Sequence, residues 1–267
     1  MRAAAALVTL TMLFTVAVFT QDRWMRRQVR VATPEAFDGG FNFCRGMYQS
    51  GRFGRGGGWS TDYPSADINL SIRLAELTKT RVSFDPAGGP NHLVVRLTDP
   101  ELFQCPFLLM AEVGSLHFDE QEAEQLRSYL LKGGFLWVDD FWGSQAWDNW
   151  EYEISKVLPP AEFPIRELGP DHPLLRTQFQ LTGIPQIPAI NFWLWSGGLT
   201  SERGADSAEV NARTISDAHG RVMVLMTHNT DISDSWEREG EDPRYFRQFS
   251  VDGYAVAINT LLYTMMH

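Results

Sequence analysis

Cysteine and positive charge are both scarce in this chain of 267 residues. The two cysteines, Cys44 and Cys105, leave two interpretations open. They form one disulfide if the chain folds in an oxidising compartment, or they are two buried thiols, since each lies in or beside an apolar run. Acidic residues outnumber basic ones by 33 to 23, and no basic stripe is present. An acidic surface repels phosphate backbones, so we expect no nucleic-acid partner.

The sequence also lacks phosphate-binding signatures and internal repeats. Its glycine-rich segment, residues 51–58, matches neither G-x-G-x-x-G nor the Walker pattern. No repeat or linker divides residues 31–267, so we expect one domain there. Hydrophobic residues make up 44% and charged residues 21%, values that are typical of a globular protein and exclude a disordered one.

Residues 1–30 have the pattern of a targeting segment. Arg2 precedes an apolar run that is followed by small residues at 15–17, as in a secretory signal peptide. The apolar run continues to Thr20, so an uncleaved anchor is the alternative. Basic residues after the run leave a cytoplasmic orientation open as well. We predict a signal peptide or anchor with a basic flank, and a periplasmic or secreted domain. If the segment is uncleaved, the domain is membrane-anchored through it alone.

The rest of the chain alternates between strand and helix patterns. Apolar or alternating runs predict strands at residues 41–48, 81–85, 92–98, 106–113 and 135–140. Helical patterns cover residues 65–77, 119–132 and 146–157, and a last one begins near residue 254. A hairpin pairs residues 212–216 with 221–228. This alternation predicts an α/β domain whose mainly parallel sheet is covered on both faces.

Several longer segments resemble a known family. They are GGFLWVDDFWG, DHPL, SERGADSAE and MTHNTDISDSWERE, which begin at residues 133, 171, 201 and 226. From residue 41 to its end the chain resembles the bacterial domains of unknown function number 4159. The resemblance implies a relation to class I glutamine-amidotransferase-like and trehalose-utilisation-like domains. It therefore implies a flavodoxin-like, three-layer fold.

The chain departs from the amidotransferases at their nucleophile. Those enzymes place a cysteine on a sharp turn at a strand end, whereas here the central strand ends in Asp139 and Asp140. Neither cysteine lies at such a turn. We therefore expect no glutaminase activity.

Acidic and aromatic residues mark the predicted strand ends, where parallel sheets bind their ligands. Asp139 and Asp140 follow an apolar strand, and burying them requires a pocket, a metal or a basic partner. The alternative is a helix cap together with an arginine pair. We predict that the ligand-binding residues are Arg45, Tyr48, Glu112, Trp142 and Trp147, with the tryptophan rings suited to stacking on sugars.

The candidate catalytic residues are Asp139, Asp140, His172 and His228. His172 follows an acid and is suited to general-base work, although a plain turn explains the same letters. A divalent metal is a further candidate, with Asp140, His228 and Asp231 as tentative ligands. His228 and Asp231 belong to the polar run of residues 228–234, for which Asx turns and a helix cap are the alternative explanation.

Three hypotheses about function follow from these patterns. The first is an exported bacterial domain that binds a small polar or sugar-like ligand at the strand carboxyl ends. The second is a metal-assisted hydrolase that uses the four candidate catalytic residues. The third is a non-catalytic structural domain of the cell envelope.

Overall fold

The computed structural model describes residues 29–51 and 57–267. The predicted signal or anchor segment therefore lies outside the described residues, apart from its last two positions, and so do residues 52–56 of the glycine-rich segment. Residues Val31–His267 form one compact unit. Within the described part of the chain, no helix has the length and apolar character needed to cross a membrane.

The central sheet has seven strands. It is mostly parallel, and this part of the fold was predicted from the sequence. Its order is β3-β1-β4-β6-β9-β8-β7. The first five of these strands run parallel, and β8 and β7 extend the sheet by antiparallel pairing. The bounds are β1 Phe43–Met47, β3 His92–Arg96, β4 Phe107–Ala111, β6 Phe135–Phe141, β7 Arg166–Glu167, β8 Asn211–Ser216 and β9 Val222–His228. A separate two-stranded sheet pairs β2 (Gln49–Ser50) with β5 (Leu116–His117).

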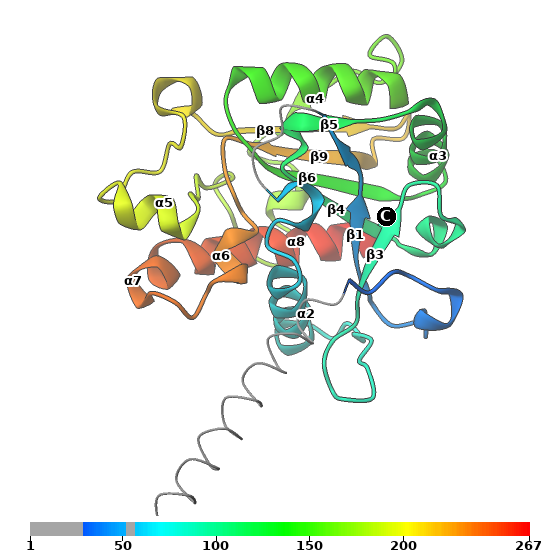
Figure 1. The fold of residues 1–267 in the computed structure, drawn as a ribbon, viewed down its shortest axis with the longest axis horizontal. Helices are drawn as coiled ribbons and strands as arrows, with labels where there is room; N and C mark the ends of the chain where they lie inside the picture. The colour runs from blue at the N-terminus through cyan, green and yellow to red at the C-terminus, as the bar shows by residue number, and fades with distance from the viewer. Residues whose placement is uncertain (1–28, 52–56) are drawn as a thin grey trace, which may run out of the picture. The chain divides into compact units, whose positions relative to one another are not determined.

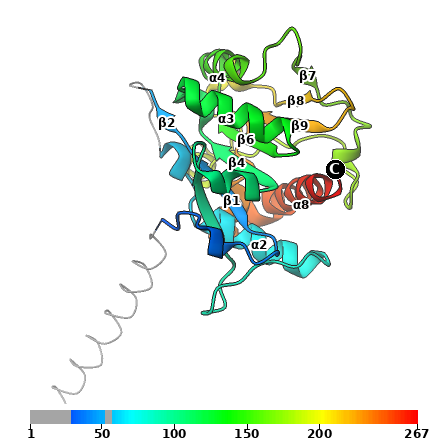
Figure 2. The same cartoon turned by 90° about the vertical axis from the view of Figure 1, so that its right-hand side faces the viewer.

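Helices cover both faces of the sheet (Figures 1 and 2). The helices α3 and α4 pack on one face, and α2 and α8 pack on the other. Short helices α5, α6 and α7 join the second face. The bounds are α2 Ser65–Leu77, α3 Glu120–Leu131, α4 Ser144–Val157, α5 Ile190–Trp195, α6 Asp234–Glu237, α7 Pro243–Tyr245 and α8 Val251–Met266.

Burial on both faces explains the apolar runs of the central strands. Every residue of β4, β6 and β9 is buried, because helices close off both sides of the sheet. The acids at positions 119 and 122 form a capping box at the start of α3: the Asp119 side chain accepts from the Glu122 backbone N–H, and the Glu122 side chain accepts from the Asp119 N–H.

Two predicted elements differ in the structure. Residues 81–85 form only isolated bridges, from Val82 to Phe41 and from Phe84 to Pro90, and no strand. Proline has no N–H, so the Phe84–Pro90 pairing cannot extend into a ladder. The last helix begins at Val251, earlier than predicted, because a π-helical turn (Phe246–Ser250) leads directly into it.

Two long-range connections fix the strand arrangement. Cys44 in β1 and Cys105, just before β4, form a disulfide between neighbouring strands. The predicted hairpin is confirmed as β8 and β9, and β9 runs parallel to β6. The carboxyl ends of β4, β6 and β9 therefore meet at one edge of the sheet.

Candidate functional site

Unusual backbone conformations gather at this carboxyl edge. Among the described residues, four that are not glycine have a positive φ: Asp62 (62°), Glu112 (51°), Asp140 (56°) and Asn229 (63°). Glu112 follows β4 directly, Asp140 lies at the end of β6, and Asn229 follows β9. Such conformations cost roughly 1–3 kcal/mol each and cluster at functional sites. Three of the four side chains are acids, so the edge is a candidate site with an acidic character.

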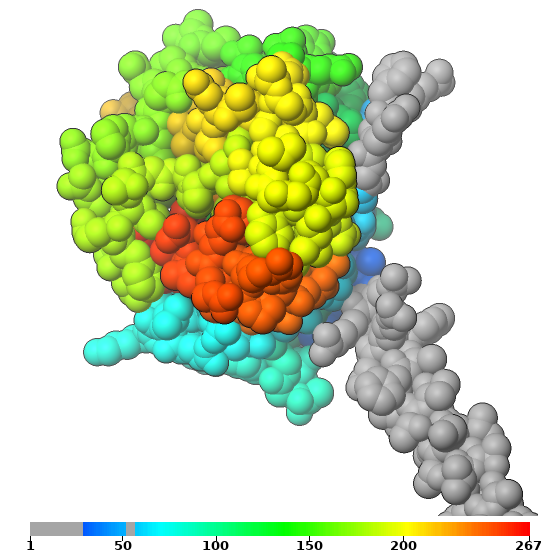
Figure 3. Space-filling view, turned by 90° about the vertical axis from the view of Figure 1, so that its left-hand side faces the viewer, coloured from blue at the N-terminus to red at the C-terminus, as the bar shows by residue number. Residues whose placement is uncertain are grey.

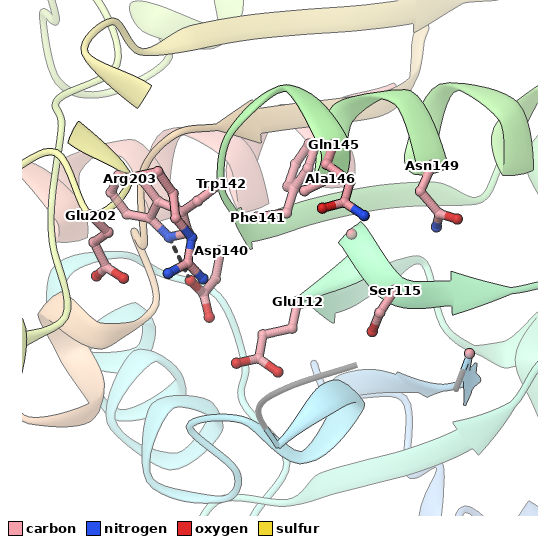
Figure 4. A pocket seen from close by; sticks show the side chains of 12 residues that line it. Glu112, Ser115, Asp140, Phe141, Trp142, Gln145, Ala146, Asn149, Glu202 and Arg203 are labelled. Carbon is pink, nitrogen blue, oxygen red and sulfur yellow. Dashed lines mark hydrogen bonds between the residues drawn. The ribbon is translucent and has the colours of Figure 1, made fainter. Parts of the chain in front are cut away.

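A bulge in β6 turns Asp140 toward this edge. The pairing of β6 with β9 shifts register between Val138 and Phe141, and the Asp140 N–H donates to the carbonyl of Thr230 at 3.2 Å. The side chain of Phe141 returns to the face that α4 covers. The Trp142 Nε1–H donates to Asp140 Oδ1 at 2.9 Å, which holds the carboxyl group in place (Figure 4).

A cavity of about 640 Å³ opens beside Asp140. Figure 4 shows its walls, with the carboxyl groups of Glu112, Asp140 and Glu202 around one space. The polar side chains of the wall are Glu112, Ser115, Asp140, Gln145, Asn149, Glu202 and Arg203. Its aromatic side chains are Phe141 and Trp142. These residues come from the ends of β4 and β6, the first turns of α4 and the loop before Gly204. Of the five predicted ligand-binding residues, Glu112 and Trp142 lie in this wall.

The cavity acids are held in a state that favours protonation. Burial raises the pKa of Asp140 well above its ordinary value, and the nearby acids Asp62 and Glu112 raise it further. Burial also raises the pKa of Glu112 and of Glu202. A protonated carboxyl group donates one hydrogen bond and accepts others, whereas a carboxylate only accepts. The cavity can therefore offer both donors and acceptors to a ligand.

A second group of acids lies behind the cavity, on the side covered by α6. Asp139 accepts from Thr227 Oγ1 at 2.6 Å and from the Ser233 N–H at 2.9 Å, and burial raises its pKa to about 7. Asp231 Oδ1 accepts from the Asp234 N–H at 2.9 Å. Burial raises the pKa of Asp231 as well, and Asp140 adds to that effect.

The loop around α5 covers this second group. Asp234 Oδ2 accepts from the Ile190 N–H at 2.6 Å and from the Tyr245 hydroxyl at 3.0 Å. The same hydroxyl lies 2.8 Å from the carbonyl of Pro188. In Figure 3 the yellow segment that contains α5 lies directly against the orange segment that contains α6 and α7. These contacts bury Asp234, and burial raises its pKa to about 7.

The structure does not bring His228 together with the acids. Its ring packs against Phe141 and Trp147, with ring centroids 4.9 and 5.5 Å apart, and its Nε2 lies 3.0 Å from the carbonyl of Gly143. Alternation along β9 places His228 on the α4 face and its neighbour Thr227, which contacts Asp139, on the other. The tentative metal set of Asp140, His228 and Asp231 is therefore split by the sheet.

His172 lies at the opposite edge of the sheet. It caps the short helix Pro173–Leu175, and its ring packs against Tyr263 at 5.8 Å. Tyr263 in turn packs against Phe135, the first residue of β6. The structure thus separates His172 from Asp139 and Asp140 by the length of that strand.

Arg45, Tyr48 and Trp147 have their contacts within the protein. Arg45 is fully buried on Asp67 and on the carbonyl of Thr61. The Tyr48 hydroxyl donates to the carbonyls of Ala111 (2.7 Å) and Glu112 (3.0 Å). The Trp147 ring lies against the Arg213 guanidinium, 4.1 Å away. The positions of Arg45 and Tyr48 suit them to holding the strand-end loops rather than to contacting a ligand.

Sequence reasoning missed several residues of this edge. Asp62, Glu202 and Glu237 lie in loops or short helices with no strand pattern before them, so no rule about strand ends selects them. Asp234 belongs to the same polar run as Asp231, and nothing in the sequence distinguishes the two acids as ligands. Gln145 and Asn149 lie four residues apart on α4, and that spacing is the signal that could have placed them on one helix face.

Comparison with known families finds a match over most of the chain. The family model described as "Domain of unknown function (DUF4159)" matches residues 47–265. A comparison with curated proteins finds no match to the chain.

Proposed function

The chain belongs to the DUF4159 family, and we propose that it binds a small polyhydroxylated, sugar-like ligand in the cavity at the carboxyl edge of its sheet. The observation that carries the proposal is the placement of Asp140. Asp140 has a left-handed backbone conformation at the bulge in β6, which turns its side chain toward the cavity. The hydrogen bond from Trp142 holds the carboxyl group there. Neither arrangement is needed to complete the sheet.

The chemistry of the cavity wall suits hydroxyl groups. Carboxyl groups with raised pKa values and the side-chain amides of Gln145 and Asn149 offer donors and acceptors at short intervals. Phe141 and Trp142 form the apolar part of the wall. Both rings are buried, with 2% and 8% of their surface exposed, so the proposal rests on polar contacts and not on ring stacking. Arg203 is the basic residue of the wall, beside three acids, so the site favours neutral or basic sugars over anionic ones.

The strand order supports the finer assignment of a flavodoxin-like fold. The parallel strands β3, β1, β4, β6 and β9 stand in the order 2-1-3-4-5 when they are counted along the chain. Folds with that order bind ligands outside the carboxyl ends of the strands, where the order reverses. Here the reversal falls between β1 and β4, and Gly51 and Glu112 line the cavity there. The proposed relation to glutamine-amidotransferase-like domains rests on the same order.

The disulfide supports a location outside the cytoplasm. Bonds of this kind persist in oxidising compartments and are rare in the cytosol. The Cys44–Cys105 bond therefore favours a periplasmic or secreted domain, or one anchored in a membrane by residues 1–30.

Calorimetric titration with a panel of neutral, amino and acidic sugars tests the binding proposal. We expect saturable binding of a neutral or amino sugar. Asp140→Asn and Glu112→Gln should each weaken it several-fold, up to about tenfold, since a hydrogen bond between neutral groups contributes roughly 0.5–1.5 kcal/mol. Glu151→Gln, on the exposed side of α4, is the matched control and should bind like the wild type. Absence of binding across the panel, or binding that both cavity variants retain, would reject the proposal.

A further inference from the structure

Three carboxyl groups converge beside the ligand cavity without forming part of its wall. Asp62, Asp234 and Glu237 each offer an oxygen, and these oxygens all lie within 4.8 Å of one another. It is the one group of three or more metal-ligating side chains among the residues that the structure describes. Asp62 precedes α2, while Asp234 and Glu237 lie one turn apart on α6.

The two elements that carry these acids are tied together. The Asn69 side chain on α2 donates to the carbonyls of Trp236 (2.7 Å) and Glu237 (3.2 Å). Asp62 is held from the other side, because Arg45 binds the carbonyl of the preceding residue, Thr61, at 2.9 Å. Hydrogen bonds of the fold therefore hold together the two segments that carry the three acids.

One oxygen of this group is buried without a partner. Asp62 Oδ2 is closed off from solvent and has no hydrogen-bond partner among the described residues. Removing a carboxyl oxygen from water without a compensating contact costs several kcal/mol. A ligand that supplies positive charge at this point would remove that cost.

The arginines within reach are already engaged. Arg45 is bound to Asp67 through its Nε and to main-chain carbonyls. Arg238 makes a bidentate pair with Glu241, at 2.8 and 2.6 Å, and lies 3.9 Å from Glu237. Burial, together with the charge of Asp62, raises the pKa of Glu237 to about 8. Arg45 and Arg238 act against this effect at Asp62, and Arg238 does so at Glu237, but burial outweighs them and both pKa values stay raised.

We propose that Asp62, Asp234 and Glu237 bind a calcium ion. The group consists of oxygen donors and contains neither histidine nor cysteine, which suits a hard cation and disfavours zinc or copper. Calcium accepts several protein carboxylates in flexible geometry, whereas magnesium retains most of its water. The site is separate from the proposed sugar site, and its occupation does not depend on any sugar.

Calorimetry and thermal unfolding of the EDTA-treated protein, with CaCl₂ as the probe, test this site. We expect one saturable calcium site and a rise in Tm on adding calcium, with a weaker response to MgCl₂. Asp234→Asn and Glu237→Gln should each weaken calcium binding at least about tenfold, because affinity follows the number of ligand charges. Asp62→Asn is a third variant, and circular dichroism shows that each variant is folded.

Glu239→Gln is the matched control. Glu239 lies two residues from Glu237 but pairs with Arg73, outside the group of three acids. The control substitution removes the same charge as Glu237→Gln does. It should keep the affinity of the wild type. No heat and no Tm shift up to about 10 mM calcium, above the weakest range of extracellular calcium sites, would overturn the proposal. Binding that persists in all three variants would overturn it too. Sugar titrations repeated in EDTA show whether the sugar site works without calcium, so a failure of the calcium site can be distinguished from a failure of the sugar site.

Discussion

Arg45 and Asp67 form a fully buried ion pair that ties β1 to α2 and holds the loop that ends at Asp62. Both side chains have no solvent exposure. The Arg45 Nε–H donates to Asp67 Oδ1 at 3.0 Å, and an Nη1–H donates to the carbonyl of Thr61 at 2.9 Å. The pair therefore holds the loop that carries Asp62, and neither residue lines the cavity.

Removal of one partner should leave the other charge buried and unpaired. We expect Arg45→Ala to lower the free energy of unfolding by about 3–5 kcal/mol. The double variant Arg45→Met/Asp67→Leu should recover much of that loss, because it leaves no charge behind. Urea unfolding followed by tryptophan fluorescence measures both. A single variant as stable as the wild type would show that the pair does not hold this loop.

The Cys44–Cys105 bond closes a long stretch of chain, with a sequence separation of 61. Replacing both residues by serine should lower the free energy of unfolding by about 2–4 kcal/mol, chiefly because the unfolded chain gains freedom. Dithiothreitol should lower the stability of the wild type to a similar extent and leave the double variant unchanged. Equal sensitivity of both proteins to the reductant would contradict the bond.

The buried acids predict how stability changes with pH. In the folded protein the pKa of Asp139 and of Asp234 is about 7, and that of Glu237 about 8, all above the ordinary values near 4. The folded state therefore binds these protons more tightly than the unfolded state does. Their contribution is fully present below about pH 4 and is lost as the pH rises through 7 to 8.

We expect the free energy of unfolding in EDTA to fall between pH 6.5 and 9, a range that brackets these values. Burial lowers the pKa of His172 and His228, so these two groups titrate in the opposite sense below this window. Glu237→Gln should flatten the decline. Urea midpoints across a pH series provide the measurement, and a level or rising profile in the wild type would contradict the assignment of raised pKa values.

His228 should matter for packing and not for calcium. His228→Phe keeps a ring between Phe141 and Trp147 but removes the contact with the carbonyl of Gly143. We expect a loss of about 0.5–1.5 kcal/mol in stability, the net contribution of one hydrogen bond, because the Gly143 carbonyl still accepts from the Trp147 N–H at 3.2 Å. Calcium affinity should stay at the wild-type value in calorimetry, because the ring lies on the other face of the sheet. A large drop in affinity would place His228 at the metal after all.

The strand ends were accessible to sequence reasoning because burial on both faces leaves a clear pattern. The apolar run of β6 ends in Asp139 and Asp140 in the sequence, and both lie at the carboxyl edge in the structure. The side to which each acid turns was not accessible. It depends on a bulge at Asp140 that shifts the register with β9 by one residue, and a one-residue shift exchanges the two faces of a strand.

The histidines show the same limit. The hairpin pattern correctly placed His228 at the end of a strand, and the parallel pairing of β9 with β6 brought that end to the acidic edge. The face of the sheet to which His228 points depends on the register of β9 with its neighbouring strands, and the sequence does not give that register. His172 had no strand before it, so proximity to Asp171 in the sequence carried no information about its place in space.

The sequence by itself determined the alternation of strands and helices, the buried central strands, the capping box of α3 and the acids at the end of β6, because each depends on neighbours along the chain. The tertiary structure alone decided that Asp62 meets Asp234 and Glu237, and that Glu112 and Glu202 face Asp140. Those contacts join segments far apart in the chain, and their geometry is set by strand order and by the packing of α2 against α6. No local pattern encodes such distances, since the energy that fixes them comes from burying whole elements against one another.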